Sequence, residues 1–127
     1  NQILKESRAE GSKIKYSGMK IMKFKSFKAE RILRGEKTSS IRLFDDKDFQ
    51  KDDDLELINS ESGKVFGHAR IHEIVEKPLG EITDADLVGH ESYESKEGMY
   101  ENLGRFYKNV GPGTPAKIVR FHLIEQK

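Results

Sequence analysis

The sequence predicts an α+β domain, built as a small mixed or antiparallel β-barrel that is decorated by two or three helices. Segments with strand and helix patterns follow one another in the order β-α-β-β-β-α-α-β. Strands of this length with few helical crossovers favour a barrel over a doubly wound sheet. Neither a P-loop nor a glycine-rich dinucleotide-binding loop occurs in the sequence, so the common nucleotide-binding α/β folds are not indicated.

The composition is that of one polar globular domain. Among the 127 residues, hydrophobic and charged residues each make up 35%, and the net charge is only +1. A role in binding nucleic acid therefore requires a local basic patch, because no field of one sign surrounds the molecule. The absence of cysteine excludes disulfides, thiolate catalysis and zinc–thiolate sites, and it fits a cytoplasmic protein. No apolar run approaches the roughly 20 residues of a membrane span, so no membrane partner is predicted.

The first elements surround a polar corner. Residues 1–18 are unlike the rest and are predicted to be a mobile amino-terminal extension or an appended leader, followed by the domain over residues 19–127. The alternating "MKIMKF" predicts a strand over 19–24. A helix is expected over 26–34, with Ser26 as its N-cap and Gly35 at its C′ position. The β-rich "TSSIRLF" then predicts another strand.

The middle of the chain predicts two further strands. An acidic loop, "DDKDFQKDDD", leads into a strand over 55–59 and a turn near Gly63. The next strand, over 65–76, contains Gly67, where a β-bulge is expected.

The carboxyl-terminal third predicts two helices and a closing strand. Thr83 is expected to cap a short helix over 84–89, and apolar residues at helical spacing predict a longer helix over 95–110. The breaker "GPGTP" ends that helix, and "AKIVRFHLIE" predicts the last strand.

Five segments in order resemble an ASCH domain, the activating-signal-cointegrator homology family. They are "ILRGEKTSSIRL", "DDDLELIN", "VFGHARIHEIV", "ESYESKEGMYENLGRFY" and "IVRFHLI", and the resemblance covers residues 19–125. The family's Gly-x-Lys-x-x-[Thr/Glu]-x-Arg corner corresponds to the stretch from Gly35 to Arg42. The chain departs from the family where Asp53-Asp54 replaces Gly-Asp, and where Ser92 replaces the glycine of a Glu-Gly-aromatic segment.

The resemblance implies a PUA-like β-barrel and a link to RNA. One bacterial branch of the family consists of small amidohydrolases that remove the acetyl group from 4-acetylcytidine with a Lys, a Thr three residues later and a downstream Glu. Carried over by position, these roles fall on Lys37, Ser40 and Glu91, with the hydroxyl kept at Ser40.

The chemistry of these three residues sets conditions that a structure can test. A serine hydroxyl needs a base, and Lys37 serves as one only if its pKa falls from about 10.4 toward neutrality. Burial or a nearby Arg42 lowers that pKa, whereas a nearby Glu91 raises it. A regular strand points Lys37 away from Ser40, so the pair requires Lys37 to lie on the turn.

Four further residues are predicted to bind ligand: Thr38, Arg42, Arg34 and Tyr93. Thr38 is a rival hydroxyl on the same strand face as Ser40. Arg42 is suited to a phosphate, although pairing with Asp45 or Asp46 is the alternative. Tyr93 either stacks on a base or is buried under the late helix.

The catalytic residues also have simpler explanations. Lys37 is alternatively a solvated turn lysine, and Ser40 is alternatively ordinary strand surface. Glu91 is alternatively a carboxylate that serves the amino terminus of the late helix.

No metal and no cofactor are predicted. His68 and His72 share a strand face but lie about 13 Å apart on a straight strand. His90 adjoins Glu91 and is a possible substrate contact, while His122 is expected to be structural or exposed.

Three functional hypotheses follow, and all of them have a nucleoside or RNA as the partner. The first is a nucleoside- or RNA-related hydrolase, most concretely a 4-acetylcytidine deacetylase. The second is a non-catalytic RNA-binding module, and the third is a weak ribonuclease that uses the same cluster. A basic segment supports the link to RNA; its members are Lys20, Lys23, Lys25, Lys28, Arg31 and Arg34. The oligomeric state is left open.

Overall fold

The computed structural model describes residues 19–45 and 47–124, and it has the α+β architecture that the sequence predicts. Residues 1–18, predicted to be an extension or a leader, and Asp46 lie outside the described residues. The elements, in chain order, are β1 (Lys20–Phe24), α1 (Ser26–Leu33), β2 (Ser39–Leu43), β3 (Asp54–Asn59), β4 (Val65–Pro78), the 3₁₀ turns η3 (Leu79–Glu81) and η4 (Ala85–Leu87), α2 (Lys96–Leu103) and β5 (Pro115–Ile124).

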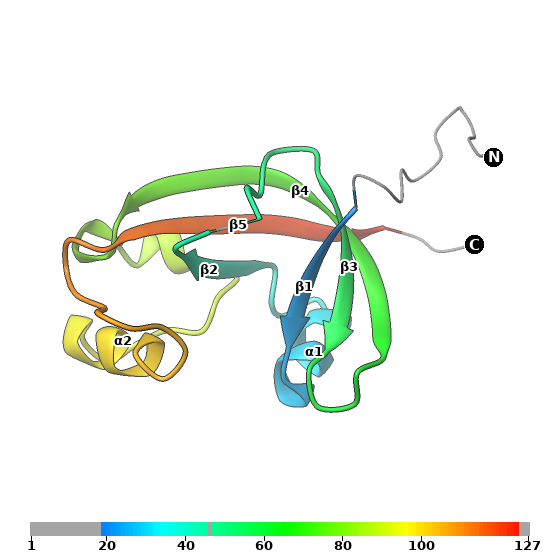
Figure 1. Ribbon diagram of the computed structural model, residues 1–127, viewed down its shortest axis with the longest axis horizontal. Helices are drawn as coiled ribbons and strands as arrows, with labels where there is room; N and C mark the ends of the chain where they lie inside the picture. The colour runs from blue at the N-terminus through cyan, green and yellow to red at the C-terminus, as the bar shows by residue number, and fades with distance from the viewer. Residues whose placement is uncertain (1–18, 46, 125–127) are drawn as a thin grey trace.

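The five strands form one mixed sheet in the order β1-β3-β4-β5-β2. The β1–β3 pair is parallel and the other three pairs are antiparallel. The sheet curls into a half-barrel, with β1 and β2 as its two free edges (Figure 1). Closure would need these two edges to pair, but residues 25–38 between them fold into α1 and the corner that follows it.

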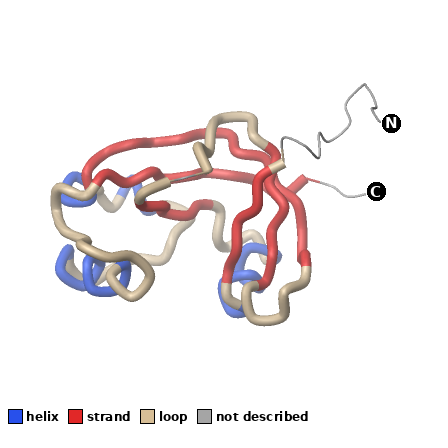
Figure 2. Tube along the Cα trace, viewed as in Figure 1, coloured by secondary structure: helices blue, strands red, loops and turns tan. Residues whose placement is uncertain are grey.

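Both helices lie on the inner side of the curved sheet. In Figure 2, α1 lies beneath β1 and β3, and α2 lies beneath the other end of β4 and β5. Two irregularities in β4 accompany the bend: its register with β3 shifts next to Gly67, where a bulge was predicted, and its register with β5 shifts between Ile71 and Glu73.

The apolar residues form two clusters, one under each half of the sheet. The first contains Met22, Phe24, Ile32, Phe49, Leu55, Leu57, Ala69, Ile71, Val119 and Phe121. The second contains Ile41, Leu43, Leu79, Ile82, Met99, Leu103, Ala116 and Ile118. β5 contributes to both clusters and so connects them.

Several predicted boundaries are corrected by the structure. Ser26 is the first residue of α1 rather than its N-cap, and its amide donates to the carboxylate of Glu61 at 2.9 Å. Gly35 does take the left-handed C′ conformation, with φ +79°. The segment predicted as a helix over 84–89 contains only a 3₁₀ turn, in which Thr83 and Asp86 cap each other.

The late helix is shorter than its predicted range of 95–110. α2 ends at Leu103 with Gly104 as its C-cap, and Val110, expected on the same helix, packs against the second cluster from the following loop. Phe106, expected on the buried face, has 55% of its surface exposed. No helix among the described residues is long and apolar enough to cross a membrane.

Candidate active site

The corner between α1 and β2 places Lys37 before the strand begins. The amides of Glu36 and Lys37 both donate to the carbonyl of Arg31, which turns the chain back over the end of α1. β2 starts only at Ser39, so Lys37 is free of the strand alternation. The position on the turn that catalysis by Lys37 requires is therefore present.

Lys37 is a buried lysine with a single carboxylate partner. Its side chain is 2% exposed, and its Nζ lies 3.0 Å from Oε1 of Glu91. Burial, the largest influence, lowers the pKa of Lys37 from 10.5 to about 8, although Glu91 opposes the shift. Lys28 and Arg42 lower the pKa further by charge repulsion. The solvated turn lysine, which was the alternative, is not what the structure contains.

Gly89 anchors the loop that delivers Glu91. The amides of Thr38 and Ser39 donate to the Gly89 carbonyl at 2.8 and 3.2 Å. Gly89 has φ +84°, and a Cβ built on it would lie 2.1 Å from Oγ1 of Thr38. Only glycine fits this contact, since both the backbone conformation and the space exclude a side chain.

Glu91 is a carboxylate with one oxygen unused. Its Oε1 accepts from Lys37, while Oε2 is buried and has no hydrogen-bond partner among the described residues. Burial alone would raise the pKa of Glu91, but nearby charges, Lys37 first, outweigh it and hold the pKa below its usual value. Ser95, not Glu91, caps α2 by accepting from the amide of Gly98 at 3.0 Å.

Ser40 and Arg42 form a second pair on the inner face of β2. Nε of Arg42 donates to Oγ of Ser40 at 2.9 Å, and the guanidinium carbon lies 5.2 Å from the centroid of the Phe24 ring. Ser40 is buried rather than lying on an ordinary strand surface. Asp45 does not take Arg42, because it pairs instead with Lys117 at 2.8 Å.

His90 and Tyr93 line the site beside Glu91. Nδ1 of His90 lies 2.9 Å from the backbone carbonyl of Glu91, which can only accept, so the proton is on Nδ1 and Nε2 is the acceptor. Burial, followed by the charge of Lys37, lowers the pKa of His90 to about 4 and keeps the ring neutral. The ring of Tyr93 lies 6.1 Å from that of His90, and burial together with Glu91 raises the pKa of Tyr93 to about 12.

Five side chains of this site line one cavity, which lies where the two apolar clusters meet. It has a volume of about 350 Å³, and its walls come from β1, α1, β2, the loop before α2, and α2 itself. Lys37, Ser40, Arg42, His90 and Tyr93 all line it. The volume lies at the lower end of the roughly 300–1,000 Å³ typical of sites for small molecules.

Three of the predicted site residues do not line this cavity: Glu91, Thr38 and Arg34. Glu91 reaches the cavity only through its contact with Lys37. Thr38 is exposed and is held against Gly89. Arg34 is exposed as well, and its Nε pairs with Glu36 at 3.1 Å. Among the described residues, no group of three or more His, Asp or Glu side chains is arranged to hold a metal ion.

Several lining residues were not identified from the sequence. Phe24, on β1, lies against the ammonium of Lys37 and the guanidinium of Arg42. Phe106 and Tyr107, which follow the end of α2, also line the cavity. For the loop that carries His90 and Glu91, the signal in the sequence was Gly89, because a glycine at that position is typical of a left-handed turn.

The comparisons with known proteins identify the fold. Neither a protein-family model nor a curated protein matches the sequence. The structure is similar to an ASCH domain from Lactobacillus crispatus, with a TM-score of 0.64 and 16% identity over 84% of this chain and 79% of that chain. It is also similar to the ASCH protein of Zymomonas mobilis, with a TM-score of 0.59 and 14% identity over 84% of this chain and 67% of that chain.

The chain has the fold of an ASCH domain. A protein from Pyrococcus furiosus shares this fold, with a TM-score of 0.58 and 19% identity over 85% of this chain and 99% of that chain. The predicted PUA-like α+β class is thereby confirmed. Within this ASCH fold, the corner after α1 and the loop before α2 come together through Gly89, although 54 residues separate Lys37 from Glu91 in the sequence.

Proposed function

We propose that this chain is a divergent ASCH-family amidohydrolase that removes the acetyl group from 4-acetylcytidine by means of Lys37, Ser40 and Glu91. The observation that carries the proposal is the placement of Lys37, which is 2% exposed, lies on the turn before β2 and lines the same cavity as Ser40. Because its pKa is about 8, a substantial fraction of the side chain is neutral near physiological pH and able to accept a proton. The sequence resemblance to the amidohydrolase branch and the ASCH fold support the choice of substrate.

Ser40 is the nucleophile in this proposal. Its Oγ accepts a hydrogen bond from Arg42 at 2.9 Å, and a positive charge at that distance stabilises the alkoxide over the neutral hydroxyl. Ser40 and Lys37 line the same cavity without hydrogen-bonding to each other, so the bound substrate completes the alignment. Apo sites often hold catalytic groups in such a loose arrangement.

Glu91 holds Lys37 in place in this proposal. Its Oε1 accepts from Nζ of Lys37 at 3.0 Å, whereas its buried Oε2 lies outside the cavity lining and reaches the exocyclic N–H of the acetylated base only when the side chain turns toward a bound substrate. The protonated hydroxyl of Tyr93 and the acceptor nitrogen of His90 remain available to the polar edge of the ring.

The reaction balances in two steps. Neutral Lys37 takes the hydroxyl proton of Ser40 while Oγ attacks the acetyl carbon. The tetrahedral intermediate then expels the exocyclic nitrogen, which takes that proton from Lys37 and leaves as cytidine. In the second step Lys37 takes a proton from water, the hydroxide attacks the acetyl-serine, and Ser40 leaves with the proton from Lys37 as acetic acid is released, which then ionises to acetate in the solvent.

The test is cytidine release from 4-acetylcytidine by the purified protein. Lys37→Ala and Ser40→Ala should abolish release, whereas Ser40→Thr should keep part of it. Ser39→Ala is the matched control, because Ser39 is also buried on β2 but does not line the cavity, and its Oγ has no hydrogen-bond partner in the described part of the chain. Turnover that survives in a folded Ser40→Ala protein would remove Ser40 as the nucleophile.

A second candidate is a non-catalytic RNA-binding module that uses the same cavity. It is favoured by the lysines and the exposed Phe106 at the cavity mouth, since stacking on aromatic rings and cation contacts are general features of RNA recognition. If the wild type is folded and releases no cytidine at high enzyme concentration, salt-dependent RNA binding becomes the leading function. Cleavage of RNA by the Lys37–Arg42 cluster is tested in the same samples.

A further inference from the structure

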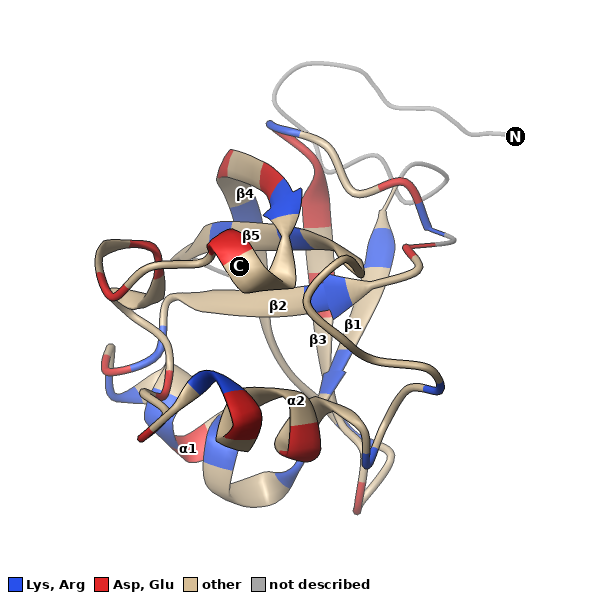
Figure 3. Cartoon of the chain, turned by 90° about the vertical axis from the view of Figure 1, so that its left-hand side faces the viewer, with Lys and Arg blue, Asp and Glu red and all other residues tan. Residues whose placement is uncertain are grey.

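The basic segment of the sequence divides into two groups in the structure. Figure 3 shows Lys and Arg residues recurring along β1 and α1. Three of these side chains each lie within 4.0 Å of a carboxylate: Lys20, Arg31 and Arg34. The other three line the cavity and have no ion pair among the described residues: Lys23, Lys25 and Lys28. We call this second group the lysine rim.

Two members of the lysine rim converge on one aromatic ring. Nζ of Lys25 lies 5.9 Å from the centroid of Phe106, and Nζ of Lys28 lies 5.6 Å from it. The ring itself is 55% exposed at the cavity mouth. Glu61 and Glu91 are near enough for Lys25 and Lys28, respectively, to lower their pKa values, after larger effects from other groups, but neither forms an ion pair with these lysines. The two like charges at the ring repel one another, so an anion bound between them would be stabilised by both.

The lysine rim is continuous with the catalytic residues. Lys28 is close enough to lower the pKa of Lys37, after the larger effect of burial, and it also acts on the pKa of His90 and Glu91. An anion at the rim therefore lies beside the cavity that holds the reacting group rather than at a separate surface.

We infer that the lysine rim binds a phosphate attached to the ribose, so that the substrate is an acetylated cytidine nucleotide rather than the free nucleoside. This inference rests on the proposed function, because it places the base beside Lys37 and the phosphate at the mouth. Lysine ammonium groups bind phosphate as point charges, and Phe106 offers a flat apolar wall to the sugar or base between the two ends. A free nucleotide and a nucleotide within an RNA strand present the same phosphate.

Binding of the product measures this site without any need for turnover. We would titrate the wild type with cytidine, cytidine 5′-monophosphate and cytidine 3′-monophosphate by calorimetry at low salt. At least one monophosphate should bind about tenfold more tightly than cytidine, and the advantage should shrink as salt is raised. Equal affinity for cytidine and both monophosphates would overturn the inference.

A matched pair of double variants assigns the preference to the rim. Lys25→Gln/Lys28→Gln should abolish the advantage of the monophosphate. Lys64→Gln/Lys108→Gln removes the same charge from two exposed lysines that do not line the cavity, and it should keep the advantage. A preference that persists in the rim variant, or an equal loss in both variants, would show that the rim is not the phosphate site.

Two further measurements distinguish a free nucleotide from an RNA strand, and failure of the phosphate site from failure of the proposed function. A cytidine trinucleotide that binds more tightly than either monophosphate assigns the phosphate to an RNA strand, and equal binding assigns it to a free nucleotide; both support the rim. A protein that binds the monophosphate through the rim but releases no cytidine from any acetylated substrate loses the hydrolase function alone. A protein that deacetylates 4-acetylcytidine but binds the monophosphate no better than cytidine loses the phosphate site alone.

Discussion

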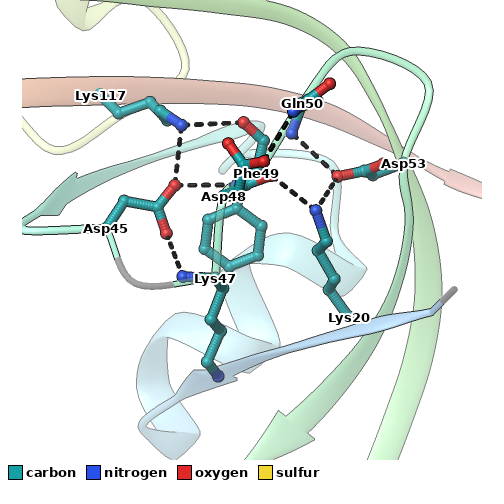
Figure 4. Close-up of polar contacts among 8 residues, drawn as sticks. All are labelled: Lys20, Asp45, Lys47, Asp48, Phe49, Gln50, Asp53 and Lys117. Atoms are coloured by element: carbon teal, nitrogen blue, oxygen red, sulfur yellow. Dashed lines mark hydrogen bonds and ion pairs between the residues drawn. The ribbon is translucent and has the colours of Figure 1, made fainter.

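Two lysine–carboxylate pairs with low side-chain exposure differ in how completely they are satisfied. Lys117 lies 2.8 Å from Asp45, with side-chain exposures of 14% and 7%, and Lys37 lies 3.0 Å from Glu91, with exposures of 2% and 21%. Lys117 also donates to the carbonyl of Phe49. Asp45 further accepts from the amides of Lys47 and Phe49, as Figure 4 shows. This first pair holds the loop between β2 and β3 in place.

The second pair has hydrogen-bonding capacity left over. Nζ of Lys37 has one hydrogen bond among the described residues, and Oε2 of Glu91 has none. Buried polar groups are normally satisfied, so an incomplete pair whose lysine lines a cavity indicates a site where a ligand supplies the missing partners. Under the proposed function, the Lys117–Asp45 pair serves folding and the Lys37–Glu91 pair serves the reaction.

The largest expected difference between Lys37 and Lys117 is in the activity of their variants. Lys37→Met removes the proposed base and should lower kcat/KM for 4-acetylcytidine by about 10³-fold, within the range of about 10²–10⁴ for general acid–base catalysis. Lys117→Met should retain turnover at a temperature where it is folded, because Lys117 lies outside the cavity. Steady-state kinetics on both variants checks this, and equal losses would break the comparison.

The second expected difference between Lys37 and Lys117 is in the free energy of unfolding of their variants. Lys117→Met leaves the half-buried Asp45 without its cation, although two amides still donate to it, and should lower the free energy of unfolding by about 2 kcal/mol. Lys37→Met also leaves Glu91 without its cation, but it removes the cost of burying the Lys37 charge, so the loss should be smaller, about 1 kcal/mol near pH 7.

Urea unfolding measures both free energies, and its pH dependence shows whether folding raises or lowers the pKa of Lys37. The pKa of Lys37 is lower in the folded state than in the unfolded state, so its neutral form is favoured by folding. The stability of the wild type relative to Lys37→Met should therefore rise from about pH 8 to about pH 10.5, as the unfolded chain keeps its proton longer. A fall over that window would mean that the pKa of Lys37 is raised.

The third effect concerns the loop that brings Glu91 to Lys37. Gly89→Ala forces a side chain onto φ +84° and onto Oγ1 of Thr38, and it should cost about 2 kcal/mol. Thr38→Ala removes that oxygen, so the double variant should be destabilised by less than the sum of the single variants. Additive losses in urea unfolding would show that the close contact is not what makes glycine necessary.

Local sequence signals accounted for most of the fold. The alternation in "MKIMKF" and "IVRFHLI", and Gly35 after a short helix, fix the strands and the corner through interactions within a few residues. The late helix was predicted too long because Phe106 continues the helical spacing, yet Gly104 ends the helix and Phe106 lies at the cavity mouth. Which apolar residue enters the core is decided by tertiary packing, which spacing alone does not contain.

Local signals also predicted part of the candidate site. Lys37 and Ser40 belong to one short motif, so the sequence indicated them together. Their burial, the contact with Glu91 and the support from Phe24 depend on strand order and on the loop at Gly89, which are long-range properties. Thr38 and Arg34 were predicted from proximity in sequence, and the strand register and the exposed turn direct them away from the cavity.

The smallest effect sharpens the electrostatic part of the comparison. If Lys37 acts as a neutral base, kcat/KM should rise with pH and level off above an apparent pKa near 8. Lys28 lowers the pKa of Lys37 and Glu91 raises it, so Lys28→Gln should move the rising limb to higher pH and Glu91→Gln should move it to lower pH. Lys64→Gln, on an exposed turn, removes one charge without moving the limb. The pH of the rising limb should shift in opposite directions in the two variants, because the titrating group lies between the cation of Lys28 and the anion of Glu91. Shifts in the same direction would assign the limb to a group other than Lys37.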